Sequence, residues 1–572
     1  MITNRVKLRA TLRLILRAVG LLPVARRFRR MLTDFLRPEP PLKPEHYQRF
    51  FRFKRRHGNV LRQSLDGAAR EQKRVLVFGS GFPEVEAELG LVKALELAGY
   101  SSTVVVSRKQ RLELKYYKLA VKQILFWEEF IPPADTEAAE AVIERCRSVQ
   151  DLMKFQYVGI RVGLFAVSTT LRVHHVGFLD FSSPKDVRIL VEQLASAMSY
   201  ATAAQRIVQR VCPALALFVD GVYTPDGELF DACVRSGVDA ISWDVAHKSN
   251  ALMFKRYNLG NRDQHPWSLS PESWQILCEM EWTDAHREQV QQELYGSYSS
   301  GDWYSTHGTQ FNKRILDAAV IRTELGLDPR KKTAFIFPHI LWDASLNWGQ
   351  DLFRDYEEWL IETVRVACAN DHVRWVIKIH PAHVGKNVVE GYRGEPAEAV
   401  VLRKHIGDLP PHVIFIPADS SISTFGLFNV MDYCLTVRGT VGIEAARLGI
   451  PALTAGTGRY SNMGFTIDSK SREEYLERVA HIQEIARLSP EQQELADRFA
   501  YGLFILRPFP LESFTLEYRD DKNFLSNIEI KIKTENEWYN APDLRAFAKW
   551  VVDSSQSDFL LPLPKTQALS PL

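Results

Sequence analysis

The stretch that decides the fold spans residues 433–468 and has the sequence YCLTVRGTVGIEAARLGIPALTAGTGRYSNMGFTID. It predicts an apolar strand, the turn Arg438-Gly439-Thr440, a short helix that carries Glu444, and a second strand that ends in a glycine-rich loop at 455–460. Such a unit directs backbone N–H groups beyond the carboxyl edge of a sheet, where a phosphate group binds favourably. Arg438 adds a forked donor for the same anion, and Glu444 can accept from sugar hydroxyls. This predicts a pocket for a nucleotide sugar or another phosphate donor.

The segments before this stretch predict further strands that alternate with helices. In the second half of the chain, apolar strands are expected at 333–337, 375–379 and 413–416. In the first half, they are expected at 74–78, 103–106, 214–219 and 240–243, the first of which runs into the turn Gly79-Ser80-Gly81. Alternation of this kind is typical of mostly parallel sheets that hold ligands at the carboxyl ends of their strands. We therefore predict an α/β chain with two Rossmann-like domains facing a cleft.

Proline-rich linkers and changes of composition along the chain predict the domain organisation. Residues 1–60 form a basic amphipathic segment and a proline-rich linker, and residues 61–330 form an N-terminal Rossmann-like acceptor domain with helical insertions. Residues 331–482 form a C-terminal Rossmann-like nucleotide-donor domain, followed by a helical segment at 483–560 that includes one strand-like piece at 527–532. Residues 561–572 are expected to be a disordered tail.

Composition excludes several classes of protein. The 572 residues are 46% hydrophobic and carry a net charge of only +3, which argues against a nucleic-acid binder. The six cysteines are scattered without CxxC or Cys/His pairs, so neither a metal site nor a disulfide framework is expected, and a cytoplasmic location is favoured. The turn at 79–81 lacks the third glycine of a dinucleotide fingerprint, and no G-x-S-x-G elbow points to a serine hydrolase.

The N-terminal segment places four arginines on one helical face, because Arg5, Arg9, Arg13 and Arg17 recur at intervals of four. Apolar residues lie beside them, but Arg17 interrupts the run that a signal peptide or a spanning helix would need. A basic amphipathic helix on an anionic membrane surface fits this pattern. The alternative is a solvated basic extension or one that packs on a partner. The expected location is therefore peripheral, on the inner face of the cell membrane.

Polar residues at other strand ends of the second half complete the predicted donor site. Lys378 and His380 share one side of their strand by period two, and His380 can donate to a phosphate or protonate a leaving group. The alternative for His380 is a structural residue before a turn, and for the hydroxyl cluster at 419–424 it is helix capping. The predicted donor-binding set is Lys378, His380, Pro381, Ser423, Thr424, Arg438, Gly439, Thr440, Glu444, Gly458 and Arg459.

The catalytic base is expected from the first half. Asp220 and Asp244 each follow a predicted strand, where a carboxylate can take a proton from an acceptor hydroxyl, and the two rank equally. His247 is close enough in sequence to share the site, and His380 is the fourth catalytic candidate. Trp342 and Trp348 follow the strand at 333–337 and can stack on a base or a sugar ring, or close the interdomain face.

At these residues the chain resembles the bacterial capsule polysaccharide biosynthesis proteins, which are glycosyltransferases of the GT-B architecture. The segments IKIHPAH and TVRGTVGIEAARLGIPALTAGTGRYSNMGFT carry the resemblance most strongly, within residues 374–468. Similarity to the capsule Kdo transferases implies a CMP-activated sugar whose phosphate meets His380, Pro381, Ser423, Thr424 and the turn 438–440, with Glu444 by the ribose. The chain differs from them in having Arg438-Gly439-Thr440 where a serine-rich turn is usual.

The sequence therefore predicts a glycosyltransferase that moves a sugar from a nucleotide-activated donor to a capsular or surface polysaccharide, or to its lipid-linked precursor. The resemblance favours CMP as the nucleotide but leaves UDP and GDP open, and no further cofactor is expected. A polyol-phosphate transferase and a nucleotide-sugar 2-epimerase are the alternatives. A non-enzymatic scaffold of a capsule assembly would leave the polar strand ends unexplained.

Overall fold

The computed structural model describes residues 44–63, 73–81, 84–343, 346–390, 394–518, 526–553 and 555–563. The predicted basic helix around Arg5–Arg17 and the predicted tail after residue 563 lie outside these ranges. The chain divides into two compact units, Met1–Phe53 and Lys54–Leu572, and the boundary falls inside helix α3 (Pro44–Arg62). Both sheets described below belong to the second unit. Among the described helices, none has the length and apolar character needed to cross a bilayer.

The first sheet has seven strands in the order β13-β6-β5-β4-β1-β2-β3. Five of them are parallel and follow the Rossmann order: β1 (Lys73–Phe78), β2 (Tyr100–Val106), β3 (Gln123–Phe126), β4 (Leu215–Phe218) and β5 (Asp239–Val245). The antiparallel strand β6 (Ala251–Tyr257) extends the sheet, and β13 (Phe509–Pro510) pairs with it at the edge. The chain thus returns to its first sheet after completing the second.

The second sheet has six parallel strands in the order β12-β11-β10-β7-β8-β9. These are β7 (Thr333–Ile336), β8 (Arg374–Lys378), β9 (Val413–Ile416), β10 (Tyr433–Thr436), β11 (Ala452–Thr454) and β12 (Ile467–Asp468). Numbered from β7, the order is that of a six-stranded Rossmann sheet. The prediction of two Rossmann-like domains is confirmed, since each parallel core has this strand order.

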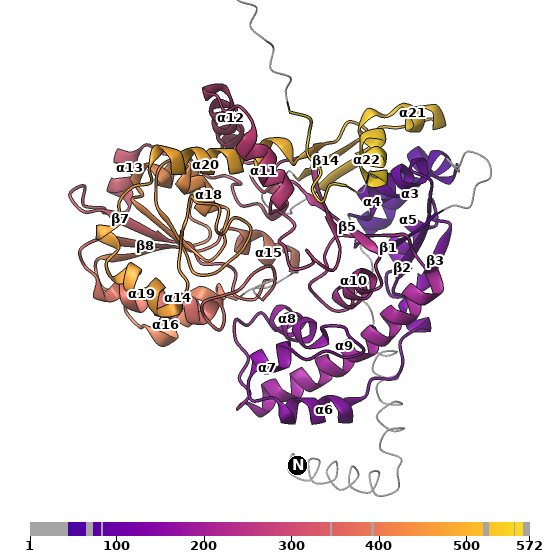
Figure 1. Ribbon diagram of the computed structural model, residues 1–572, viewed down its shortest axis with the longest axis horizontal. Coiled ribbons are helices and arrows are strands. Elements are labelled where there is room, and N and C mark those ends of the chain that lie inside the picture. Colours follow the sequence, from indigo (N-terminus) through magenta and orange to yellow (C-terminus); the bar gives the residue numbers. More distant parts are fainter. Residues whose placement is uncertain are drawn as a thin grey trace, which may run out of the picture. The chain divides into compact units, whose positions relative to one another are not determined.

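Helices cover both faces of the second sheet (Figure 1). Helices α14 (Tyr356–Ala369), α16 (Ala397–His405) and α19 (Arg472–Ala480) pack on one face, around Trp359, Trp375 and Tyr475. Helix α13 (Ala318–Glu324), α17 (Thr424–Leu427) and α18 (Val441–Ala446) cover the other. Because β8 is buried on both faces, its alternate side chains enter the two cores in turn, and Lys378 shares a face with Val376.

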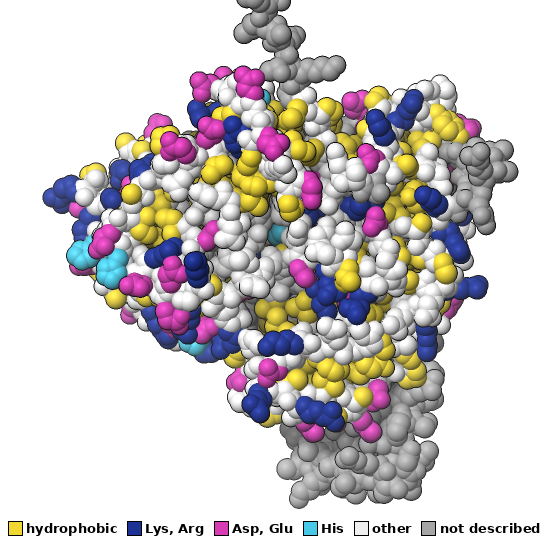
Figure 2. All heavy atoms as spheres, viewed as in Figure 1, with side chains coloured by type: hydrophobic (Ala, Val, Ile, Leu, Met, Phe, Trp, Pro, Cys, Tyr) yellow, Lys and Arg dark blue, Asp and Glu magenta, His cyan; other side chains and the backbone are white. Residues whose placement is uncertain are grey.

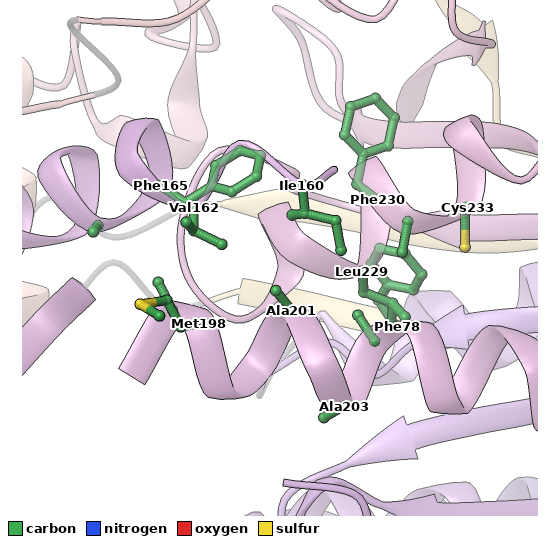
Figure 3. Close-up of a cluster of buried hydrophobic side chains, with 14 of the residues drawn as sticks. Phe78, Ile160, Val162, Phe165, Met198, Ala201, Ala203, Leu229, Phe230 and Cys233 are labelled. Carbon is green, nitrogen blue, oxygen red and sulfur yellow. The ribbon is translucent and has the colours of Figure 1, made fainter. Parts of the chain in front are cut away.

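The first sheet is flanked by a helical layer formed by α6 (Thr136–Arg145), α7 (Val149–Met153), α8 (Val162–His174) and α9 (Pro184–Val211). Helix α9 begins at the Ser183 cap with proline at its first position, and it buries a row of alanines and leucines. Figure 3 shows Ala201 and Met198 of α9 in one apolar cluster with Phe165 of α8 and Leu229 of helix α10 (Asp226–Arg235). This core supports the carboxyl end of β4.

The remaining described elements connect or close the two sheets. In the first half these are α4 (Val85–Leu97), α5 (Arg111–Tyr117), α11 (Pro271–Glu279) and α12 (Asp284–Ser300). Helix α15 (Ala382–Glu390) follows β8. The segment predicted as helical after residue 483 contains α20 (Pro490–Tyr501), α21 (Glu535–Asn540) and α22 (Pro542–Val552), but also β13 and the hairpin β14 (Phe514–Tyr518) and β15 (Ser526–Ile530).

Candidate active site at the two switch points

Each Rossmann-like sheet has one point where the chain leaves neighbouring strands in opposite directions. In the second sheet this point lies between β7 and β10, and in the first sheet it lies between β1 and β4. Ligands of such sheets bind beyond the carboxyl ends of these strands. β7 leads to His339 and β10 to Arg438, whereas β1 leads to Gly79 and β4 to Asp220. The topology therefore selects four of the strand ends as the candidate site.

His339 supports the turn that follows β10. Its Nε2 atom accepts the backbone N–H of Arg438 at 3.2 Å and lies 3.3 Å from the Thr436 hydroxyl. Burial lowers the pKa of His339 well below its usual range, and the positive charge of Arg438 adds to the effect. The ring is therefore neutral, and since Nε2 accepts, the proton resides on Nδ1. This role was not evident in the sequence, because the partners of His339 lie on a strand almost a hundred residues away.

Arg438 is 4% exposed and is already engaged within the fold. Its Nη1 donates to the Asn347 carbonyl at 2.6 Å, and its Nη2 forms an ion pair with Asp351. The predicted role as a forked anion donor therefore does not fit this geometry, because the fork is occupied by the loop that follows β7. Of the three guanidinium nitrogens of Arg438, Nε alone has no hydrogen-bond partner among the described residues.

The backbone of the predicted phosphate cradle is also partly occupied. The Gly439 N–H donates to the Thr436 hydroxyl at 3.1 Å, and the Gly458 N–H donates to the Ser461 hydroxyl at 2.7 Å. At Gly458 a Cβ would lie 2.7 Å from the Arg438 Cβ, so this glycine allows the two loops to pack. The N–H groups of Thr440 and Val441 have no acceptor in the part of the chain that the structure describes, and they remain available to an anion.

Arg459 is the cation of this region that is least committed to a carboxylate. Its Nη2 lies 3.0 Å from the His265 Nε2, and its Nε has no hydrogen-bond partner among the described residues. The other ring nitrogen of His265 accepts the Trp267 N–H at 2.9 Å. A neutral imidazole accepts at only one nitrogen, so it cannot satisfy both donors. The Arg459 guanidinium is therefore only partly satisfied in this structure.

His380 lies at the carboxyl end of β8 as a neutral ring. Burial lowers its pKa to about 3, with further effects of His383, His307 and Lys386. The predicted role in which His380 protonates a leaving group needs a charged ring near neutral pH and therefore does not fit this environment. Its Nδ1 accepts the Ala382 N–H at 3.2 Å, across the turn that Pro381 begins, so Nε2 carries the proton and can donate to a phosphate oxygen.

Lys378 is buried two residues earlier, and its Nζ lies 3.4 Å from the Pro417 carbonyl. Burial lowers the pKa of Lys378 to about 7, helped by the neighbouring charge of Lys313. This lysine is close to its titration point at neutral pH. Lys378 lies on the same side of β8 as the α17 and α18 layer, whereas His380 lies beyond the last residue of this strand.

Three predicted donor ligands serve the fold instead. The Ser423 hydroxyl accepts the Phe425 N–H as the cap of α17 and donates to Gln310 at 2.9 Å. Thr424 follows as the buried first residue of that helix. Glu444 is 2% exposed and accepts the Tyr298 hydroxyl at 2.6 Å, while burial raises its pKa to about 7. Glu444 is therefore not free to meet a ribose in this structure.

Asp220 and Asp244 are both partly buried carboxylates at strand ends. Asp220 follows β4 and accepts the Val222 N–H at 2.9 Å, and burial raises its pKa to about 6. Asp244 accepts the Val245 N–H at 2.8 Å and the Trp267 indole N–H at 3.2 Å, and burial raises its pKa also to about 6. The neighbours Val219, Gly221 and Val222 of Asp220 line a cavity, which sets Asp220 apart from Asp244.

His247 does not belong to this site. Its side chain is fully buried between the rings of Trp303 and Phe504, and its Nε2 lies 2.8 Å from Glu293 of α12. Burial lowers the pKa of His247. Burial opposes ionisation of Glu293, but contacts with His247 and Lys248 outweigh it and lower the Glu293 pKa to about 2. The sequence placed His247 three residues after Asp244, but the chain turns it into the core.

The cavity beside Asp220 has a volume of about 250 Å³. Its walls come from the loop after β4, from Arg161 before α8, from the segment at 257–266, and from the loop 346–350 after β7. Trp348 lines it, whereas Trp342 is buried in the first core, where its ring faces His175 and the cations Arg172 and Lys386. The two tryptophans that the sequence grouped together are thus separated by the fold.

A charged network near Asp220 was missed by the sequence interpretation. Asp343 pairs with Arg172 of α8 and with Lys386 of α15, each at 2.5 Å, and accepts the Tyr223 hydroxyl at 3.2 Å. Burial opposes ionisation of Asp343, but the two cations outweigh it and hold its pKa at about 2. The network joins elements of both sheets, and Arg172 and Lys386 also lower the pKa of Asp220 against the effect of burial. No sequence pattern pointed to Arg172 or Lys386.

The described residues contain no group of three or more His, Cys, Asp or Glu side chains that could hold a metal ion. Two sets of protein groups, from side chains and from the backbone, are available at the strand ends of the candidate site. One provides a carboxyl group poised to accept a proton. The other provides N–H donors from Thr440, Val441, Arg459 and His380.

Comparison with known proteins gives similar solved structures only. No protein-family model matches the chain, and no curated protein matches it. The KpsC β-Kdo 2,4-transferase of Thermosulfurimonas dismutans aligns over 57% of this chain and 87% of its own length, with 12% identity and a TM-score of 0.32. A glycosyltransferase from Rickettsia africae covers 85% of this chain and all of its own, at 8% identity and a TM-score of 0.29. The UDP-GlcNAc 2-epimerase of Neisseria meningitidis, bound to UDP-GlcNAc, covers 75% and 96%, at 12% identity and a TM-score of 0.24.

Proposed function

We propose that this protein is a glycosyltransferase that uses a nucleotide-activated sugar. The observation that carries the proposal is the pairing of the two switch points. One presents a carboxyl group, Asp220, beside a cavity, and the other presents neutral and cationic N–H donors. A sugar transfer needs a base for the acceptor hydroxyl and donors for the departing phosphate.

The proposed reaction divides the work between the two halves. Asp220 takes the proton from the acceptor hydroxyl, whose oxygen forms a bond to the anomeric carbon. The bond between that carbon and the phosphate oxygen breaks, and the nucleotide leaves with the bonding electrons. The N–H groups of Thr440 and Val441, with Arg459, hold the phosphate as its charge grows. The Nε2–H of His380 donates to the same group without changing its charge state.

The acceptor and the location are part of the proposal. A growing surface polysaccharide or its lipid-linked precursor fits the resemblance at residues 374–468, and the basic residues before position 44 favour contact with the inner membrane surface. The donor nucleotide is proposed to be CMP, with UDP and GDP as the other candidates to be tested.

A screen of nucleotides by thermal shift tests the proposal. We expect one of CMP, UDP or GDP to raise the unfolding temperature, and the matching nucleotide sugar to be consumed with release of the nucleotide when acceptor is supplied. Stabilisation by a CDP-polyol would assign a polyol-phosphate transferase, and interconversion of the sugar without transfer would assign a 2-epimerase. If a folded sample responds to no nucleotide, the glycosyltransferase proposal is refuted.

A further inference from the structure

The cavity beside Asp220 is lined by both aromatic and charged side chains. Its lining includes the aromatic residues Phe218, Phe230, Tyr257 and Trp348. The lining also includes the charged residues Arg161, Arg262 and Asp263. Figure 2 shows Lys and Arg side chains gathered beside an apolar hollow on the face where α10 lies. A flat aromatic surface next to fixed polar groups suits a ligand with one apolar face and a polar edge.

Trp348 reaches this cavity through a strained backbone. Its φ is 65°, which lies in the left-handed region that is unfavourable for a bulky side chain. Two hydrogen bonds of the flanking residues hold this conformation. The Asn347 carbonyl accepts from Arg438 Nη1 at 2.6 Å, and the Gln350 N–H donates to the Thr457 hydroxyl at 2.8 Å. Gly349 permits the approach, since a Cβ there would lie 2.2 Å from the Thr457 carbonyl oxygen. Arg438 and the glycine-rich loop thus fix an indole in the wall of a cavity of the other half.

The polar side of the cavity is balanced in charge. Asp231 is fully buried and accepts from Arg161 Nε at 3.1 Å and from Arg262 Nη1 at 2.6 Å. Asp263 pairs with Arg161 and keeps 72% of its side chain exposed. Two guanidinium groups therefore face two carboxylates. An anionic ligand would meet cations that are already compensated, whereas hydroxyl groups, which both donate and accept, find both kinds of partner.

We propose that this cavity is a binding site for a neutral saccharide, with one face of the sugar ring against Trp348 and its hydroxyl groups on Arg161, Arg262 and Asp263. The site itself stands on the cavity and its walls. Its assignment as the acceptor site rests on the proposed function, because Asp220 adjoins the cavity through Val219 and Gly221. An acceptor hydroxyl bound here lies on the side of the chain that supplies the base.

Saturation-transfer NMR without nucleotide tests the site separately from turnover. The probes are methyl β-D-glucoside, methyl β-D-galactoside, N-acetylglucosamine and maltose, with glucuronic acid as the acidic counterpart. We expect transfer to at least one neutral probe and at least tenfold weaker binding of glucuronic acid. Trp348→Ala should weaken the neutral probe at least tenfold, and Trp348→Phe should retain most of the binding because it keeps a ring.

Two further variants keep the result interpretable. Asp263→Asn, at an exposed carboxylate, should weaken the neutral probe and relax the discrimination against glucuronic acid. The control, Tyr295→Ala, removes a half-exposed ring of α12 that does not line the cavity and should change nothing. The proposal is overturned if no neutral probe receives transfer, if glucuronic acid binds better, or if folded Trp348→Ala binds as the parent does. A nucleotide response without saccharide binding would leave the proposed function standing and remove only this site.

Discussion

Replacement of Glu228 by Gln should stabilise the protein, and increasingly so as the pH rises. Glu228 is fully buried in α10, below the loop that carries Asp220. Thr224 donates to its Oε1 at 2.8 Å, while its Oε2 has no hydrogen-bond partner among the described residues. Burial raises the pKa of Glu228 to about 8, and the hydrogen bond from Thr224 only partly opposes this. Gln keeps the acceptor for Thr224 and places a neutral amide where the protonated oxygen lies.

The magnitude follows from the difference between the two states. The unfolded chain ionises Glu228 near the ordinary glutamate pKa of 4.5, whereas the folded protein keeps the proton until about pH 8. Between these values the folded state binds more protons, so the free energy of unfolding falls by about 1.4 kcal/mol per pH unit. At pH 7 the loss is on the order of 3 kcal/mol, and it is nearly absent below pH 4.5. Gln does not titrate and therefore avoids the loss.

Urea unfolding at a series of pH values measures this effect. The midpoints of Glu228→Gln and the parent should be similar at about pH 4.5 and should separate steadily toward about pH 8, with the variant more stable. The matched control is Glu281→Gln, which makes the same substitution at an exposed position. A constant difference between Glu228→Gln and the parent across this range would show that Glu228 is ionised in the folded state, and would refute the reasoning.

Three other predictions concern the site. Asp220→Asn should lower turnover by about 10²- to 10⁴-fold with unchanged nucleotide binding. The activity of the parent protein should rise with pH through about 6, because the base works only when it is deprotonated. Parental turnover in the variant would exclude Asp220 as the base. Arg459→Met should weaken nucleotide binding at least tenfold by calorimetry, and Arg459→Lys should weaken it less. Unchanged nucleotide binding by Arg459→Met would show that the phosphate binds elsewhere. Glu293→Gln should destabilise the fold by about 1–3 kcal/mol, since it weakens the buried contact with His247. Turnover should stay within twofold of the parent. A loss of turnover in a folded sample would show that His247 belongs to the active site.

The sequence alone determined the two parallel sheets. Apolar strands that alternate with amphipathic helices have few other arrangements that bury the apolar surfaces of both the strands and the helices. It failed at β6, whose Lys255 and Arg256 resemble surface residues. Lys255 is buried against Asp558, and Arg256 donates to the Trp550 and Val551 carbonyls, almost three hundred residues later. A charge that is neutralised by so distant a partner leaves no local pattern, so this strand was not predicted.

The residue types at the strand ends were likewise evident in the sequence, but their tasks were not. Arg438 follows a strand at a switch point, as an anion ligand would, yet tertiary packing gives its fork to Asn347 and Asp351 and thereby holds Trp348 in a cavity of the other half. Burial lowers the pKa of His380 to about 3 and keeps its ring neutral, which the sequence does not show. Periodicity fixes which face of an element a side chain occupies, whereas hydrogen-bond partners, protonation and access depend on what the rest of the chain brings against that face. Only the tertiary structure decides those.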